Sequence, residues 1–425
     1  MRKISLEKLD SLFSAIAENN VLYMPVDTKT GAKFEKWENG KKPSDSLNTV
    51  RSAKDFFFPQ TENLMDFKVE GKKIEVIDTR SETEDFVVFG VRACDVKSFD
   101  VLDKVFLAEP QDSYYKNRRE HGVIMSLACT KPNETCFCTT FGIDAAEPAG
   151  DVVCHKTEDA LYMDAKTEKG EKLLKVLEGI TENADNKAVT EQQKVTRERM
   201  AKLPLAGLKA DAFGDGKTKE FFDRPEWKEL SESCLGCGTC TFVCPTCQCY
   251  DIKDYDTGHG IQRYRCWDSC MYSDFTMMAH GNNRTSQMQR FRQRFMHKLV
   301  YFPANNEGMY SCVGCGRCIA ICPKDAIRPG LDSSEKILNC KITEYAKAVL
   351  DGRPSYCINI VRDISPNCDC HAENDVPIVP DVGMFASADP VALDLACAEA
   401  VNRQPVMPNC AITDLQLEHD CDRFH

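Results

Sequence analysis

Eight cysteines fall into two copies of one spacing, and this repeat constrains the chain more than any other feature. The copies are Cys234-x2-Cys237-x2-Cys240-x3-Cys244-Pro245 and Cys312-x2-Cys315-x2-Cys318-x3-Cys322-Pro323. A [4Fe–4S] cube needs four thiolates, and the x2 spacings let three successive cysteines wrap one face of it. The fourth cysteine, followed by proline, reaches the other cluster. One predicted ligand set is Cys234, Cys237, Cys240 and Cys322, and the other is Cys312, Cys315, Cys318 and Cys244.

Glycines within both copies fit the same interpretation, because tight loops around sulfur need backbone freedom and open N–H groups. They are Gly236, Gly238, Gly314 and Gly316. Structural zinc is the alternative, but zinc sites usually show paired Cys-x2-Cys knuckles without a third cysteine at x2. We therefore predict a bacterial-ferredoxin-like module with two [4Fe–4S] clusters over 233–330.

Cysteine content and net charge limit the cellular compartment and the class of protein that we expect. The chain has 425 residues, 24 of them cysteine, and a net charge of −12. The N-terminal sequence MRKISLEKLDSLF has no apolar core and no small-residue cleavage site, so we expect no signal peptide and no disulfide framework. No stretch approaches the roughly 20 apolar residues of a membrane span, and the acidic balance argues against general nucleic-acid binding. We expect a cytoplasmic protein of an anaerobe or of a strongly reducing cytosol.

The periodicity of apolar residues predicts an α+β chain whose first domain, 1–170, is of α/β type. Residues 5–19 show helical spacing, and apolar runs at Ile74–Ile77, Phe86–Val91 and Val123–Leu127 are typical of strands.

The rest of the chain divides by composition. Residues 171–232 are predicted to be a charged helical connection followed by a linker rich in Gly and Pro. After the module, the extension 331–425 is predicted to begin with a helix at Ile342–Leu350 and to become loop-rich.

A second group of cysteines follows the predicted strands of the N-terminal domain. Cys94 comes after the run 86–91, Cys129 ends the run 123–127, and Cys136 and Cys138 lie in the next loop. Four cysteines at strand ends are a candidate third cluster. The alternative is that they are buried, inert thiols, since free cysteine packs as a small hydrophobe.

Further cysteines lie outside these groups. Cys247 and Cys249 follow the first copy of the repeat, and Cys266 and Cys270 come shortly afterwards. They either bind a metal or cluster, with Cys247, Cys249 and Cys270 as the candidate ligands, or pack as thiols around the first cluster.

The extension holds a compact donor group, Cys368-Asp369-Cys370-His371, with Cys357 upstream. The carboxylates Asp381, Asp389 and Asp394 follow nearby. A metal site with Cys368 and Cys370 is one interpretation, and a hydrogen-bonded loop is the default.

A basic run interrupts this acidic chain between the two copies of the repeat, whose facing cysteines, Cys244 and Cys312, are 68 positions apart. Its members are Arg284, Arg290, Arg292, Arg294, His297 and Lys298. We interpret the run as a solvated helix face or as a docking face for an acidic partner protein, where charge speeds encounter.

Several longer stretches identify relatives. "FGVRACDVKSFDVLDKVF", "CFCTTFG", "SCLGCGTCTFVCPTCQCYDI", "RCWDSC" and "RFRQRFMHK" resemble the iron–sulfur beta subunit of cytoplasmic sulfhydrogenases and the iron–sulfur electron-transfer subunit of anaerobic sulfite reductase, over residues 1 to about 325. The resemblance implies that the chain relays electrons between a flavin subunit that uses NAD(P)H and a catalytic subunit. That catalytic subunit would be of the sulfite or polysulfide reductase type, or a hydrogenase.

The extension resembles a different group. "ITEYAKAVLDG" and "DISPNCDCHAENDVPIVPDVGMFASADPVALDLACAEAV" look like the C-terminal part of a widespread, poorly characterised family of ferredoxin-containing proteins. The chain is therefore interpreted as a mosaic whose changeover falls near the second copy of the repeat.

Three functions follow from these features. The leading hypothesis is a non-catalytic electron-transfer subunit of a multi-subunit oxidoreductase. The alternatives are a stand-alone iron–sulfur redox enzyme and an iron–sulfur sensor or scaffold. The sequence shows no Gly-x-Gly-x-x-Gly after a strand and no nucleophile signature of its own.

Overall fold

The computed structural model describes the chain except for residues 30, 47, 328–334, 367–375 and 415–425. It separates into two compact units, Met1–Gly330 and Leu331–His425. The first unit contains both copies of the cysteine repeat and the N-terminal group of cysteines. The candidate electron-transfer chemistry therefore belongs to this unit.

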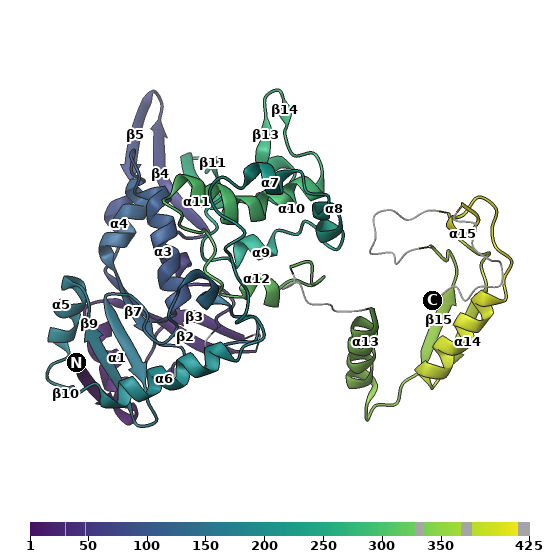
Figure 1. The fold of residues 1–425 in the computed structure, drawn as a ribbon. Coiled ribbons are helices and arrows are strands. Elements are labelled where there is room, and N and C mark those ends of the chain that lie inside the picture. The colour runs from purple at the N-terminus through teal and green to yellow at the C-terminus, as the bar shows by residue number, and fades with distance from the viewer. Residues whose placement is uncertain (30, 47, 328–334, 367–375, 415–425) are drawn as a thin grey trace. The chain divides into compact units, whose positions relative to one another are not determined.

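An eight-stranded mixed sheet forms the N-terminal part of the first unit (Figure 1). Its order is β10-β1-β9-β8-β7-β6-β2-β3, and β8, β7, β6 and β2 in its centre run parallel. The strands are β1 Arg2–Ser5, β2 Val21–Thr28, β3 Gly31–Lys36, β6 Phe86–Val91, β7 Gly122–Leu127, β8 Val152–Lys156, β9 Ala160–Ala165 and β10 Glu182–Asn183. The predicted α/β character of this part of the chain is confirmed.

Helices cover both faces of this sheet because its central strands are apolar on both sides. Along β6, Val87 and Phe89 pack with α1 and α5, whereas Phe86 and Val88 pack with α2, α3 and α4. This alternation is the two-residue period of a strand. The helices are α1 Leu9–Ala17, α2 Lys54–Phe57, α3 Ala93–Phe106, α4 Ser113–His121 and α5 Glu168–Val176.

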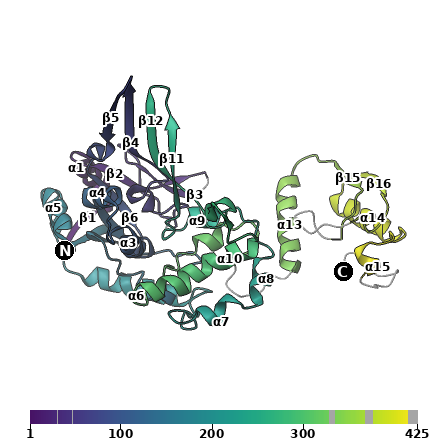
Figure 2. The same cartoon turned by 90° about the horizontal axis from the view of Figure 1, so that it is seen from above.

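A second sheet joins segments that are far apart in the sequence. Its order is β11-β12-β4-β5, and β12 pairs antiparallel with β4. Figure 2 shows the two hairpins side by side, projecting away from the larger sheet. The strands are β4 Thr61–Glu70, β5 Lys73–Asp78, β11 Tyr250–Asp256 and β12 Gly260–Trp267. The segment between the two cysteine copies is thus built into the N-terminal part of the unit.

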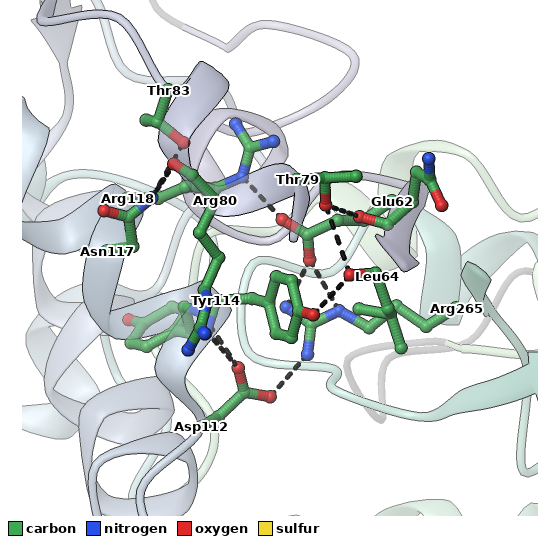
Figure 3. Close-up of polar contacts among 12 residues, drawn as sticks. Glu62, Leu64, Thr79, Arg80, Thr83, Asp112, Tyr114, Asn117, Arg118 and Arg265 are labelled. Atoms are coloured by element: carbon green, nitrogen blue, oxygen red, sulfur yellow. Dashed lines mark hydrogen bonds and ion pairs between the residues drawn. The ribbon is translucent and has the colours of Figure 1, made fainter. Parts of the chain in front are cut away.

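Buried ion pairs stabilise the junction between this second sheet and the N-terminal part of the unit (Figure 3). Glu62 of β4 accepts hydrogen bonds from Arg265 Nε and Arg118 Nε, each at 2.7 Å, and Arg265 Nη1 donates to Asp112 at 2.5 Å. Glu62 and Arg118 also lie on the wall of a cavity of about 440 Å³. Because Arg265 and Glu62 are both buried, removing either would leave the other charge only partly compensated, by Arg118 or by Asp112.

The charged connection and the linker are more structured than the composition indicated. The helical stretch is broken into α5 and α6 (Lys187–Ala201), with β10 between them. In place of an open linker, α7 (Thr218–Phe222) and α8 (Glu226–Ser231) bury Phe221 and Trp227 against α10. Apolar anchors therefore hold this segment to the body of the unit.

Short helices and one longer helix complete the first unit. They are α9 Thr239–Phe242, α10 Gln287–Met296, α11 Phe302–Asn305 and α12 Arg317–Ala320, with the small strands β13 Met277–Met278 and β14 Gly281–Asn282. Helix α10 begins with a capping box at Ser286 and Gln289 and continues into a π-helical turn at His297–Tyr301. Such turns are rare and frequently lie at functional sites.

The second unit has a small core of its own. Its elements are α13 Glu335–Leu350, β15 Cys357–Val361, β16 Gly383–Ser387, α14 Pro390–Asn402 and α15 Ala411–Asp414. The core includes Val379, Leu393, Cys397 and Cys410. The predicted first helix is present, and the described part of the loop-rich remainder also contains two helices and a two-stranded sheet. In neither unit does a described helix have the length and apolar character of a membrane span.

Candidate iron–sulfur centres

Four cysteines from two distant segments line one cavity of the first unit. Cys234 and Cys237 lie between α8 and α9, Cys240 belongs to α9, and Cys322 follows α12. The Gln287 amide donates to Cys234 Sγ at 3.3 Å. This first cavity brings together three cysteines of the first copy and the fourth cysteine of the second.

A second cavity, of about 280 Å³, is lined by the complementary set of four. Its cysteines are Cys244, Cys312, Cys315 and Cys318. The structure thus brings together the two groups that the spacing defines, while ligation by these groups stays our proposal. The described residues contain no group of three His, Cys, Asp or Glu side chains placed to hold a single metal ion. Four thiols around a cavity are what a [4Fe–4S] cube requires, so the residues fit this cofactor.

The loop of the second copy is held against the N-terminal part of the unit. Gly316, which precedes α12, has φ +73°, and a Cβ there would lie 2.2 Å from the Thr135 carbonyl oxygen. Arg317 is buried and pairs in bidentate fashion with Asp95 of α3, at 2.5 and 2.7 Å. A glycine and a buried ion pair therefore fix the second cavity to the larger sheet.

The N-terminal cysteines gather beside this second cavity. Cys94, Cys129, Cys136 and Cys138 pack in one cluster that also contains Cys315. Cys94 is the second residue of α3, which follows β6, and Cys129 follows β7; these strands are parallel neighbours, so their carboxyl ends meet at one edge of the sheet. Burial raises the pKa of all four thiols, that of Cys138 to about 12.

Two polar groups that sequence reasoning missed face these thiols. The buried Arg92 guanidinium donates to the Ser46 carbonyl at 2.8 Å, and its charge acts against burial by lowering the pKa of the Cys129 thiol. The Asn48 amide donates to Cys136 Sγ at 3.5 Å. A cation and an amide donor beside clustered thiols are the partners that an anionic iron–sulfur cluster needs. The only sequence signal for Arg92 is its position two residues before Cys94.

The cysteines after the first copy form pairs instead of lining a cavity. Cys247 is paired with Cys244, and Cys249 with Cys270: within each pair the neighbouring thiol lowers the pKa of the first copy's Cys244 and of Cys249 and raises that of Cys247 and of Cys270. Cys266 is placed apart on β12, where its charged neighbours are Lys253, Asp251 and Asp268. This pairing is the contact expected of packed thiols, and ligation by Cys247, Cys249 and Cys270 stays a prediction.

The basic run is neither a uniformly solvated face nor a uniform docking face. Arg294 and Lys298 are buried, with 3% and 5% of their surface exposed. Arg292 instead donates to the Phe222 carbonyl at 2.9 Å near the surface. The interpretation of the run as one exposed face is therefore wrong for Arg294 and Lys298, which turn toward the cysteines.

The candidate site of the extension is only partly visible. Cys368 and Cys370 lie outside the described residues. The nearby carboxylates have structural roles: Asp389 caps α14, Asp381 accepts the Asp363 N–H, and Asp394 accepts from the Asn359 amide.

Comparison with known proteins agrees with this arrangement. Residues 233–326 match the family described as the 4Fe-4S dicluster domain. The chain is 32% identical over 345 residues to sulfhydrogenase 2 subunit beta of Pyrococcus furiosus, an alignment that covers 77% of this chain and 98% of that relative. No solved structure matches the chain.

Two four-cysteine cavities within a 4Fe-4S dicluster domain define an iron–sulfur protein. More closely, the chain belongs to the family of sulfhydrogenase beta subunits, as the extent of the alignment shows. The resemblance noted in the sequence is confirmed for this family.

Proposed function

We propose that this chain is an electron relay between a flavin subunit that oxidises NAD(P)H and a catalytic subunit. The catalytic partner would be of the sulfite or polysulfide reductase type, or a hydrogenase. Membership of the sulfhydrogenase beta subunit family supports a role within a multi-subunit oxidoreductase. When bound, [4Fe–4S] clusters supply one-electron redox chemistry over a wide range of potentials.

The observation that carries this proposal is the adjacency of the two cysteine cavities. Arg294 and Ile327 each lie on the walls of both, so the two cavities are neighbours. The cavity-lining cysteines are proposed as the eight ligands: Cys234, Cys237, Cys240 and Cys322 for one cluster, and Cys312, Cys315, Cys318 and Cys244 for the other.

A third cluster at Cys94, Cys129, Cys136 and Cys138 extends the relay in this proposal. Cys136 Sγ lies 4.0 Å from the carbonyl oxygen of Cys315, a lining residue of the second cavity. Arg92 and Asn48 supply positive charge and a hydrogen-bond donor to this group. The proposed order is therefore first cavity, second cavity, N-terminal group.

The test is electron transfer through the purified complex. The tagged chain is isolated anaerobically with its bound subunits, and NAD(P)H is added while flavin and cluster absorbance are followed. The proposal expects flavin reduction followed by cluster reduction. In a complex with Cys318→Ser, flavin reduction should persist while transfer to the catalytic subunit falls at least tenfold. Equal transfer in both complexes, or substrate turnover by the isolated chain, would overturn the relay and favour a stand-alone enzyme.

A further inference from the structure

One guanidinium lies between the two cysteine cavities. Arg294, near the end of α10, is a lining residue of both. It is buried, and burial, the largest influence, would by itself lower the pKa of its guanidinium. The nearby cysteines, Cys240 and Cys318 first among them, outweigh burial and hold this pKa well above its usual range.

The hydrogen bonds of Arg294 are incomplete. Its Nη2 donates to the Cys240 carbonyl at 3.3 Å, and its Nε has no hydrogen-bond partner in the structure. Within the described part of the chain, no carboxylate forms an ion pair with it. A buried cation without a counter-charge costs several kcal/mol, so the position points to an anion in the space that it lines. A [4Fe–4S] cluster with four thiolates is such an anion.

Lys298 provides a second buried cation, but at one cavity only. It lies in the π-helical turn after α10 and lines the second cavity. Its Nζ donates to Thr246 Oγ1 at 2.7 Å and to the Ser311 carbonyl at 3.0 Å. Thr246 Oγ1 in turn lies 3.3 Å from Cys244 Sγ. The ammonium thus connects through one hydroxyl to a proposed ligand of the second cluster.

We propose that Arg294 is a positioning residue for both clusters, and that its charge and its free N–H raise the reduction potential of each cluster. Lys298 acts on the second cluster alone. This inference rests on the proposed function, because it requires clusters in the two cavities. Each reduction adds a negative charge, and a buried cation stabilises the reduced form more than the oxidised form. Hydrogen bonds to the sulfurs and burial tune such potentials.

Neighbouring residues of the same helix supply the control. Arg292 lies two positions away, donates to the Phe222 carbonyl and stacks on the Phe222 ring at 3.7 Å, and lines neither cavity. Arg292→Met therefore removes a charge from α10 without removing it from a cavity wall. Any effect of Arg294→Met that Arg292→Met lacks belongs to the position and not to the net charge of the chain.

The experiment is an EPR-monitored redox titration of the full chain, reconstituted anaerobically, with iron measured for each variant. We expect Arg294→Met to shift the midpoint potentials of two clusters to more negative values, and Lys298→Met to shift one. Arg294→Lys should recover part of the shift, and Arg292→Met should leave all midpoints within error of the parent chain. If Arg294→Met does not retain iron, Arg294→Gln replaces it, with the same expected direction.

The outcomes separate the two proposals. Absence of iron from the parent chain would overturn the proposed function itself. Full iron in the Arg294 variants with unchanged midpoints would overturn only the role of Arg294. If Arg294→Met shifts the midpoint potential of only one cluster, the result would contradict the placement of Arg294 between the two clusters.

Discussion

Phe137 and Gly314 join the N-terminal cysteine group to the second cysteine cavity through their main chains. The Phe137 N–H donates to the Gly314 carbonyl at 2.8 Å, and a Cβ on Gly314 would lie 2.4 Å from the Phe137 carbonyl oxygen. Only a residue without a side chain fits this approach. The contact lies between Cys136 and Cys138 on one side and Cys315 on the other, so it sets the separation of the proposed second and third clusters.

Replacing Gly314 should weaken the contact between the N-terminal cysteine group and the second cavity. Gly314 has φ +58°, a backbone conformation that costs a non-glycine residue about 1 kcal/mol, and the backbone overlap adds to that cost. Gly314→Ala should therefore lower the free energy of unfolding by about 2 kcal/mol or more and reduce bound iron. The matched control is Gly308→Ala, with φ +80° and open space around the added Cβ. Equal effects on stability and iron in urea unfolding and iron assays would contradict the role of the contact.

If the N-terminal cysteines bind the proposed third cluster, replacing one of them should cause a defined loss of iron. Cys136→Ser and Cys138→Ser should each remove about four irons per chain and leave the two-cluster EPR signal of the ferredoxin-like module, since a cluster needs four ligands. Cys266→Ser is the control, because Cys266 lies on β12 away from both cavities and should change nothing. If iron is unchanged in all three variants, these N-terminal cysteines are packed thiols.

The buried ion pair at the sheet junction should matter far more than an exposed pair on the same strand. Arg265→Met leaves the buried Glu62 with Arg118 as its remaining cation and should cost about 3 kcal/mol of unfolding free energy, the lower end of the range for a broken buried pair. Arg263→Met breaks the exposed pair with Asp254 and should leave the unfolding free energy nearly unchanged, since water screens an exposed pair. Urea unfolding of both variants measures the two costs in unfolding free energy. Similar costs would mean that the pairing of β12 with β4 depends on the backbone alone.

His297 should make stability fall in mild acid. Burial, together with Lys298 and Arg284, lowers the pKa of His297 from 6.5 to about 4. Between these values the unfolded chain binds a proton that the folded chain does not, so stability is full above pH 6.5 and is lost as the pH falls toward 4. At pH 5.5 the loss is about 1 kcal/mol relative to pH 7.5. His297→Gln should remove this part of the pH dependence of the urea midpoint; an unchanged slope would contradict it.

The local features of the chain could be predicted from sequence because they depend on spacing. The cysteine repeat defines which four thiols share a cavity, and alternating apolar residues locate strands such as β6 and β7. The resemblance of several stretches to sulfhydrogenase beta subunits can also be recognised in the sequence, because these stretches surround the cysteines.

The remaining features depend on contacts between distant segments. Pairing of β12 with β4 has no signature in local periodicity. The burial of Arg294 and Lys298 was missed because arginine and lysine are normally exposed. Their burial is understandable only once the negative charge of the two proposed clusters is considered. Phe221 and Trp227 could have indicated that the linker at the end of 171–232 is not open, but its glycines and proline dominated the pattern.

The most direct test of the proposed relay is iron and acid-labile sulfide per chain after anaerobic purification, with EPR of the dithionite-reduced protein. We expect about twelve irons and twelve sulfides, as three [4Fe–4S] clusters require, with signals from interacting clusters. About eight irons would keep the ferredoxin-like pair and remove the third cluster. A protein that holds no iron after anaerobic reconstitution would contradict the central claim that this chain carries electrons.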